Sequence, residues 1–190
     1  MTTWRQAFPN ESPMKGSTKI FSDCAVVVSP TAEQLAEIAM HAAKNGERFL
    51  QHERPRIAML SFSSQGSSTA IEAQIVQEAL GIIHGNTTQN GIHDRGYVYD
   101  GELQLDAAIV PHVAASKAPD SPLSGTANVL IFPNLGAGNI GYKMAERMAG
   151  AVAVGPILQG LSQPANDLSR GCTTEDILDV MAVTVLQVET

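Results

Sequence analysis

The sequence lacks three features that would each indicate a class of protein. Its two cysteines, Cys24 and Cys172, are too few for the disulfide framework of a small secreted domain. The formal net charge is −7, from 12 basic and 19 acidic residues, and no stretch is dense in Lys or Arg, so a nucleic-acid partner is not expected. No segment reaches the ~18 consecutive apolar residues of a membrane span, and residues 1–13 lack the apolar centre of a signal peptide. We therefore expect a soluble, cytoplasmic protein without a membrane partner.

A metal-ligand pattern is missing as well. The histidines have neither metal-site spacing nor a nearby acid to orient them: His41, His52, His84, His93 and His112. Surface or core positions are the simpler interpretation, and we predict no metal site.

What the sequence does contain is an alternation of short apolar runs with helical patterns. Apolar runs predict strands over residues 24–28, 57–62, 127–132 and 151–154. Apolar residues at helical spacing predict helices over 31–45, 71–80, 139–149 and 174–188, and a short helix near 107–110. Ser29 and Pro30 would begin the first helix, and residues 85–96 look irregular. This alternation indicates an α/β fold, with a mainly parallel sheet flanked by helices.

One domain is expected from the length of the chain. With 190 residues and 44% hydrophobic content, the chain can form one well-packed core. Residues 1–18 are polar and contain Pro9, Pro13 and Gly16, which predicts an N-terminal arm or linker before a domain over 19–190. The last helix is apolar on more than one face, so we expect it to be buried on two sides or to dock on another surface.

Three loops are candidates for a ligand site, because ligands of parallel sheets usually bind at the carboxyl ends of the strands. They are SFSSQGSS at 61–68, PNLGAGN at 133–139 and the long loop at 155–172. Two of them lead into helix N-termini, where free backbone N–H groups can face an anion. Gly136 to Asn139 resemble a phosphate cradle, although glycines at such a junction are often only what a tight turn requires.

The loop at 155–172 ends in NDLSRGC, which places a hydroxyl, a guanidinium and a thiol side by side before the last helix. Thr173 and Asp176 fit an N-cap and its reciprocal acid, which is a purely structural pair. A cap does not require Arg170, however, and Ser169, Arg170 and Asp176 would converge on one small volume. Cys172 could be a nucleophile, but small buried cysteines are more frequent. Lys117 could bind an anion, but solvated surface lysines are commoner.

These motifs resemble the C-terminal part of phosphate acetyltransferase, also called phosphotransacetylase. The strongest stretches are VLIFPNLGAGNIGYKMAERMAG and AVGPILQGLSQPANDLSRGC. The segments FSDCAVVVSPTAEQLAEIA, RIAMLSFSSQGS and DGELQLDAAIVPHVAASKAPDSP also match, so the resemblance covers about residues 21–187. It implies the C-terminal portion of the phosphate acetyl/butyryltransferase fold.

The resemblance also implies a reaction and roles for particular residues. The reaction would exchange an acetyl group between coenzyme A (CoA) and inorganic phosphate by direct transfer, with no metal or other cofactor. Ser169 would hydrogen-bond the reacting carbonyl, Arg170 would hold phosphate or CoA, and Asp176 would accept the thiol proton. We expect further contacts to CoA or phosphate from Gly138, Asn139, Lys143 and Gly155. Cys172 would then be a neighbour of the reaction and not an acyl carrier.

Elementary chemistry supports two of these roles and questions the third. A hydroxyl and a guanidinium suit a developing oxyanion and a phosphate. The reference pKa values of an aspartate and a thiol, about 3.9 and about 8.5, differ by an amount worth about 6 kcal/mol. A helix N-terminus would widen that gap. Asp176 would therefore have to be desolvated, or the thiol acidified by Arg170.

Two alternatives follow from the front of the chain. Family members have a further α/β portion upstream, where this sequence has only MTTWRQAFPNESPMKGSTKI. The chain could therefore be a catalytically weak module that binds CoA or acetyl-CoA, or a fragment of a longer enzyme. Family members are typically dimers, so we also expect a homo-oligomer, with the last helix at the cleft.

Overall fold

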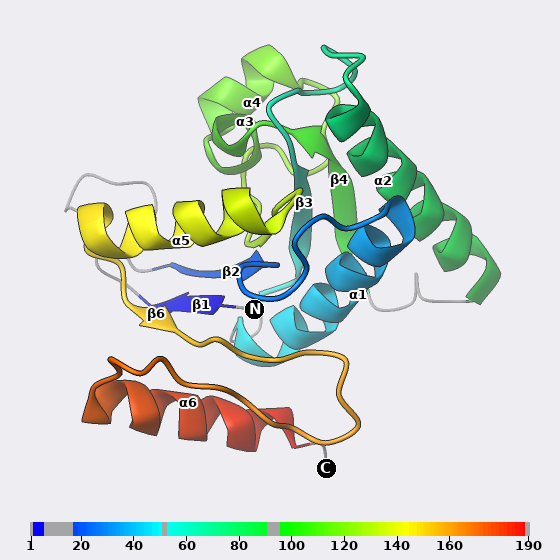
Figure 1. The fold of residues 1–190 in the computed structure, drawn as a ribbon. Coiled ribbons are helices and arrows are strands. Elements are labelled where there is room, and N and C mark those ends of the chain that lie inside the picture. The colour runs from blue at the N-terminus through cyan, green and yellow to red at the C-terminus, as the bar shows by residue number, and fades with distance from the viewer. Residues whose placement is uncertain (1, 6–16, 51–52, 91–95, 189–190) are drawn as a thin grey trace.

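A computed structural model describes residues 2–5, 17–50, 53–90 and 96–188. Strands and helices alternate along most of the chain (Figure 1). The strands are β1 (Thr2–Arg5), β2 (Thr18–Ser22), β3 (Arg56–Leu60), β4 (Val98–Leu103), β5 (Val129–Ile131) and β6 (Ala153–Val154). The helices are α1 (Ala32–Phe49), α2 (Ile71–Asn90), α3 (Leu105–Ile109), α4 (Pro111–Lys117), α5 (Leu135–Ala149) and α6 (Thr174–Gln187).

The strands form one six-stranded sheet with the order β4-β3-β5-β2-β1-β6. The four strands from β4 to β2 are parallel to their neighbours, whereas β1 is antiparallel to both β2 and β6. The predicted α/β fold with a mainly parallel sheet is therefore confirmed. β1 lies within the predicted N-terminal arm, residues 6–16 fall outside the described part of the chain, and the boundary at residue 19 stays a prediction.

Each face of the parallel sheet is covered by helices, and successive side chains of β3 point alternately to the two faces. Ile57 and Met59 point into a core shared with α1 and α2, whereas Ala58 and Leu60 belong to a second core with α3 and the segment that follows α4. Figure 1 shows α1 and α2 together on one side of the sheet, and α3, α4 and α5 on the other.

The strand predicted over residues 24–28 is wrong, because the carboxylate of Asp23 holds these residues in a turn. It accepts hydrogen bonds from the backbone N–H groups of Ala25, Val26 and Val27 at 2.7–3.1 Å. Those groups are then not available to a strand ladder. Val26 and Val28 are 61% and 68% exposed, and the strand of this region, β2, ends before the turn at Ser22.

Other boundaries also differ from the sequence prediction. α1 begins two residues after Pro30, since Thr31 and Gln34 form its capping box. β4 was not predicted, because Asp100, Gly101 and Glu102 interrupt its apolar pattern. α2 continues to Asn90, into the stretch predicted to be irregular. The remaining predicted strands and helices are present, with ends shifted by a few residues.

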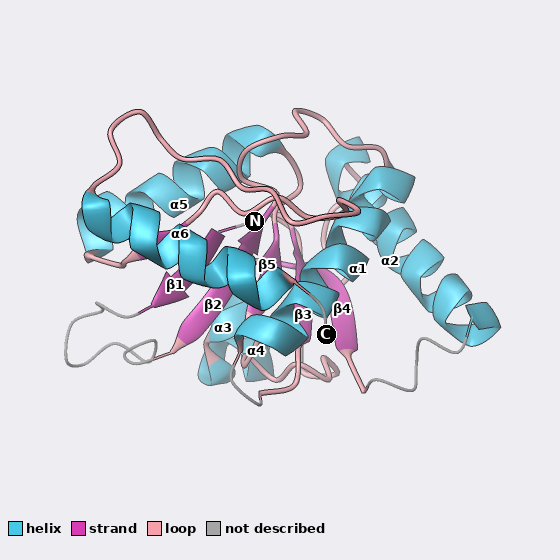
Figure 2. Cartoon of the chain, turned by 90° about the horizontal axis from the view of Figure 1, so that it is seen from below, coloured by secondary structure: helices cyan, strands magenta, loops and turns pink. Residues whose placement is uncertain are grey.

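The last helix is buried on one side only. α6 contacts α1 and β6, and seen from below it runs from the region of α5 toward α1 (Figure 2). Val180 and Gln187 face the protein, whereas Leu178, Met181 and Val185 are 59–71% exposed. The expected burial on two sides is therefore not found in this chain, and the apolar outer face remains available to another surface. Among the described residues, no helix is both long and apolar enough to cross a membrane.

Candidate functional site

A cavity of about 540 Å³ lies beside α5, and we call it the α5 cavity. Four parts of the chain meet there: the turn after β2, α5, the segment around β6, and the loop that leads into α6. The lining residues are Cys24, Ala25, Asn139, Tyr142, Lys143, Glu146, Arg147, Ala153, Gly155, Pro156, Leu168, Ser169, Gly171, Cys172 and Asp176. The structure thus brings five of the predicted site residues to one cavity: Asn139, Lys143, Gly155, Ser169 and Asp176.

Arg170 occupies a different position from its neighbours. Its side chain is exposed, and it is not among the described residues that line the α5 cavity. It directly follows Ser169, which does line the cavity, and its contact with a ligand stays a prediction.

Asp176 forms the capping box of α6 that its spacing predicts. Its Oδ2 accepts a hydrogen bond from the backbone N–H of Thr173 at 2.7 Å, and Thr173 Oγ1 accepts one from the N–H of Asp176 at 3.2 Å. The hydrogen bonds from Thr173 lower the pKa of Asp176. The carboxylate is therefore ionised at neutral pH, but it is a weaker base than an ordinary aspartate.

Gly138 and Asn139 attach α5 to the turn that follows β2. A Cβ atom on Gly138 would lie 2.2 Å from the carbonyl oxygen of Asp23, so only glycine permits this approach. Asn139 Nδ2 donates to the carbonyl oxygen of Cys24 at 3.2 Å. The helix itself is capped by Asn134, which accepts from the N–H of Ala137 at 2.9 Å. The predicted phosphate cradle thus has a structural role, and its contact with a ligand stays a prediction.

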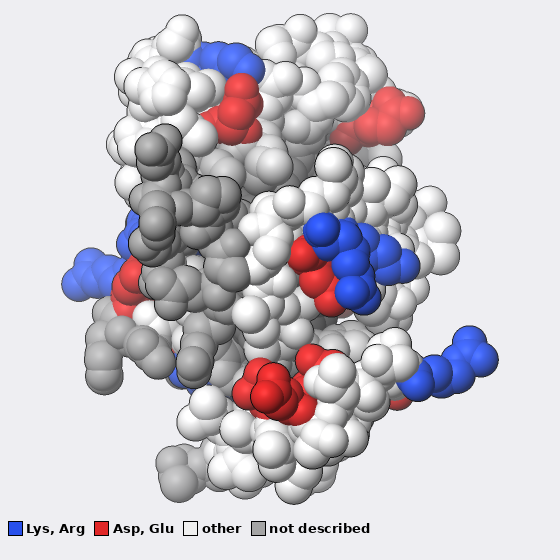
Figure 3. Space-filling view, turned by 90° about the vertical axis from the view of Figure 1, so that its left-hand side faces the viewer, with Lys and Arg blue, Asp and Glu red and all other residues white. Residues whose placement is uncertain are grey.

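The charges of the α5 cavity are balanced. Its lining includes the cations Lys143 and Arg147 and the carboxylates Glu146 and Asp176, and Arg147 Nε lies 3.6 Å from Glu146 Oε2. Figure 3 shows basic and acidic side chains close together on this side of the molecule. Lys143 Nζ lies 5.7 Å from the centre of the Tyr142 ring. Burial, followed by the charge of Glu146, raises the pKa of Tyr142.

The two cysteines of this cavity differ in their surroundings. Burial raises the pKa of Cys24 to about 12, so its thiol is protonated and unreactive at neutral pH. Cys172 is a free, half-buried thiol beside Ser169. Within the described ranges, no group of three His, Cys, Asp or Glu side chains is arranged to hold a metal ion.

The predicted loop at 61–68 lines neither this cavity nor the second one described below. Glu102, which is 1% exposed, holds it in place: Oε1 accepts from Ser63 Oγ at 2.6 Å and from the N–H of Gly66 at 2.8 Å, and Oε2 accepts from Gln77 Nε2 at 3.0 Å. Burial alone would raise the pKa of Glu102, but these hydrogen bonds outweigh it and the pKa is lowered. Lys117 forms an ion pair with Asp106 at 2.7 Å, which favours its structural interpretation.

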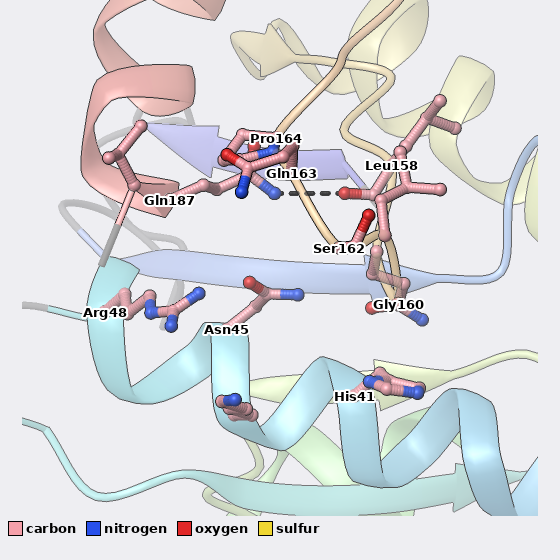
Figure 4. Close-up of a pocket in the computed structure, with 13 residues that line it drawn as sticks. His41, Asn45, Arg48, Leu158, Gly160, Ser162, Gln163, Pro164 and Gln187 are labelled. Atoms are coloured by element: carbon pink, nitrogen blue, oxygen red, sulfur yellow. Dashed lines mark hydrogen bonds between the residues drawn. The ribbon is translucent and has the colours of Figure 1, made fainter.

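A second cavity, of about 430 Å³, lies between α1 and the loop at 158–164, and we call it the α1 cavity (Figure 4). Its lining residues are His41, Lys44, Asn45, Arg48, Leu158, Gln159, Gly160, Leu161, Ser162, Gln163, Pro164, Gln187 and Val188. Sequence reasoning missed it. The available signal was the spacing of His41, Lys44 and Arg48, which places three basic side chains on one face of a helix.

Comparison with known proteins shows the family to which this chain belongs. The family model for phosphate acetyl/butaryl transferase matches residues 10–185. The chain belongs to this family. It is 48% identical over 181 residues to a phosphate acetyltransferase of Treponema pallidum (strain Nichols), an alignment covering 93% of this chain and 52% of that protein. It is 52% identical over 170 residues to a phosphate acetyltransferase of Thermoanaerobacterium thermosaccharolyticum, and this alignment covers 90% of this chain and 49% of that protein.

Solved structures of this family have the same fold. An EutD phosphotransacetylase from Staphylococcus aureus superimposes with a TM-score of 0.85 at 42% identity, covering 98% of this chain and 54% of that one. A phosphotransacetylase from Streptococcus pyogenes gives a TM-score of 0.83 at 45% identity, with the same coverage. The predicted family is confirmed, and the chain spans about half the length of the relatives it matches.

Proposed function

We propose that the α5 cavity is part of a site at which an acetyl group moves between CoA and inorganic phosphate, interconverting acetyl-CoA and acetyl phosphate. One observation carries the proposal. Ser169, Asp176 and Lys143 line the same cavity, in a chain that belongs to this family. A hydroxyl, a carboxylate and a fixed cation are the groups that acyl transfer to and from phosphate requires.

Ser169 and Arg170 would stabilise the two anionic groups of the reaction. The Ser169 hydroxyl would donate to the carbonyl oxygen as negative charge builds on it, which lowers the barrier more than it strengthens substrate binding. The Arg170 guanidinium would bind phosphate in a bidentate manner. Lys143 would add a second positive charge from α5. Gly155, Asn139 and Gly138 would shape the walls against CoA.

Asp176 would accept the proton of the CoA thiol. The sulfur then bonds to the carbonyl carbon of acetyl phosphate, the bond between that carbon and the phosphate oxygen breaks, and phosphate leaves with the electron pair. The lowered pKa of Asp176 makes this proton transfer unfavourable in the arrangement described. We infer that substrate binding must displace the N–H of Thr173 from the carboxylate or dehydrate the cavity, since either change raises the basicity of Asp176.

We also propose a homodimer or larger homo-oligomer in the cytoplasm, working without metal or other cofactor. The outer faces of α5 and α6 carry apolar side chains that are each more than half exposed: Ile140, Met144, Met148, Leu178, Met181 and Val185. Exposed apolar surface of this kind is typical of protein interfaces. Light scattering that gave the mass of one chain at micromolar concentration would contradict this assembly.

A CoA-binding module with little turnover is the second candidate, because the chain spans about half of its relatives. The deciding experiment measures acetyl phosphate formation from acetyl-CoA and phosphate, with calorimetric CoA binding on the same sample. Ser169→Ala should lower kcat by about 100-fold or more and change CoA affinity little. Ser116→Ala is the matched control, since this exposed hydroxyl on α4 lines neither cavity. CoA binding without acetyl phosphate formation by the unmodified chain would favour the binding module.

A further inference from the structure

Several polar side chains that line the α1 cavity already have partners within the protein. Lys44 and Arg48 take part in interactions of their own. Gln187 Oε1 accepts from Asn166 Nδ2 at 2.7 Å, and Gln187 Nε2 donates to the carbonyl oxygen of Leu158 at 3.0 Å. Recognition of a ligand in this cavity is therefore left to the other polar groups of the lining.

Asn45 is the buried polar side chain of the lining that lacks a partner. It is 6% exposed, yet its carboxamide makes no hydrogen bond in the part of the chain that the structure describes. Figure 4 shows this group extending from α1 toward the loop at 158–164. The unpaired side-chain atom that is enclosed by protein is Gln159 Oε1 and not an atom of Asn45, so the Asn45 carboxamide is open to the cavity. Buried polar groups are nearly always paired, so this one requires a partner.

The chemistry of a carboxamide defines the partner that satisfies it. Asn45 presents an acceptor, Oδ1, directly beside a donor, the Nδ2 amide. A second amide matches both, because its N–H donates to Oδ1 while its carbonyl oxygen accepts from Nδ2. Asparagine recognises the edge of a nucleobase by two hydrogen bonds of the same kind. A carboxylate would leave Oδ1 without a donor, so an anion fits this group less well than an amide does.

The wall opposite Asn45 offers apolar contact. Figure 4 shows Leu158 and Pro164 on the loop that faces α1, and Leu161 of the same loop is 51% exposed. A ligand with an apolar ring beside its amide would cover these side chains and remove their surface from water. The cavity volume of about 430 Å³ lies within the usual range of small-molecule sites.

From these features we propose that the α1 cavity binds a small uncharged molecule that carries an amide group on an apolar ring. The amide pairs with the Asn45 carboxamide through two hydrogen bonds, and the ring lies against Leu158, Leu161 and Pro164. This site is separate from the proposed acetyl-transfer site, because the two cavities share no lining residue.

The test observes Asn45 directly and needs no catalytic activity. Nicotinamide, an aromatic ring with a primary amide, is added to the protein while the side-chain amide signals are followed by NMR. The proposal predicts a saturable shift of the Asn45 Nδ2 signals at millimolar ligand. Those of Asn139, which lines the α5 cavity, should not move. An unmoved Asn45, or a shift at Asn139 in its place, would overturn the proposal.

Two further ligands of the same shape separate amide recognition from other causes. 3-Acetylpyridine keeps the ring and the carbonyl but has no N–H, and nicotinate carries a carboxylate in place of the amide. Each should bind at least about fivefold more weakly than nicotinamide, since each leaves Oδ1 without its donor. If either bound as tightly as nicotinamide, the paired hydrogen bonds would be contradicted. Tighter binding of nicotinate would assign recognition to charge.

A substitution at Asn45 locates the site. Asn45→Leu has a side chain of similar size that favours the helix, so the variant should fold, and circular dichroism checks this. Nicotinamide binding, followed at the backbone N–H of Gly160 in the same cavity, should weaken about tenfold or more. Gln74→Leu is the matched control, because it removes an exposed carboxamide on α2 that lines neither cavity. Unchanged affinity in Asn45→Leu, or an equal loss in Gln74→Leu, would contradict the proposal. If Asn45→Leu did not fold, the three ligands would decide the question on the unmodified chain.

Discussion

The two cavities are built in different ways. The α5 cavity is assembled from a turn, a helix face, a short strand and a loop that leads into α6, and its two cations are matched by two carboxylates. Among the described residues that line the α1 cavity, the charged side chains, Lys44 and Arg48, both come from α1. A balanced set of charges such as that of the α5 cavity suits a reaction in which protons and charge move.

One segment nevertheless belongs to both cavities. Residues 158–164 line the α1 cavity, and Leu168, Ser169, Gly171 and Cys172 line the α5 cavity. Between them, Asn166 accepts from the N–H of Leu158 at 2.8 Å and donates to Thr184 Oγ1 and Gln187 Oε1, both at 2.7 Å. Gln187 in turn donates to the carbonyl oxygen of Leu158 at 3.0 Å, the contact drawn in Figure 4.

The largest expected effect is a loss of turnover on replacing Asp176, the proposed base of the α5 cavity. Asp176→Asn keeps a side-chain oxygen for the cap but cannot take up a proton, so turnover should fall about 100-fold or more. The free energy of unfolding should fall by less than about 1 kcal/mol. Acetyl phosphate assays and urea unfolding measure the two quantities. A variant that lost stability and kept its turnover would leave Asp176 with the capping role alone.

The pH dependence of stability gives a second readout of the same substitution. The pKa of Asp176 is lowered in the folded protein, so its carboxylate stabilises the fold above the pKa of the unfolded chain. That stabilisation is lost as the pH falls through the folded-state value. The stability difference between the original chain and Asp176→Asn should therefore shrink in acid. A difference that grew in acid would contradict the assigned hydrogen bonds.

An intermediate effect concerns the attachment of α5 to the turn after β2. Gly138→Ala places a Cβ atom against the carbonyl oxygen of Asp23, which forces α5 away from the turn and should cost about 1–3 kcal/mol of stability. The α5 cavity should then lose CoA binding, which calorimetry measures. Gly81→Ala on α2 is the control, since no atom lies within 4 Å of its added Cβ. It should leave the fold as stable as before, or more stable. Equal behaviour of the two variants would contradict the close contact at Gly138.

The smallest effect tests the link between the cavities. Asn166→Ala removes hydrogen bonds that hold the shared segment and should cost about 1–2 kcal/mol. Turnover should weaken by several-fold, because the shared segment carries Ser169 to the α5 cavity. Gln163→Ala, which alters the α1 cavity alone, should leave turnover unchanged. If Asn166→Ala lost this stability and kept full turnover, the segment would not link the two cavities.

The sequence by itself determined the α/β class, most of the helices, and the cap that joins Thr173 to Asp176, since each depends on residues close together in the chain. It did not predict the turn at 24–28, because apolar residues favour a strand unless a neighbouring carboxylate takes their N–H groups, as Asp23 does. It pointed to Ser169 and Asp176 through motif resemblance, but the placement of Lys143 and Gly155 beside them depends on how α5 crosses the sheet. Only the tertiary structure revealed the α1 cavity, since its two walls are more than 100 residues apart and neither wall alone encloses a space.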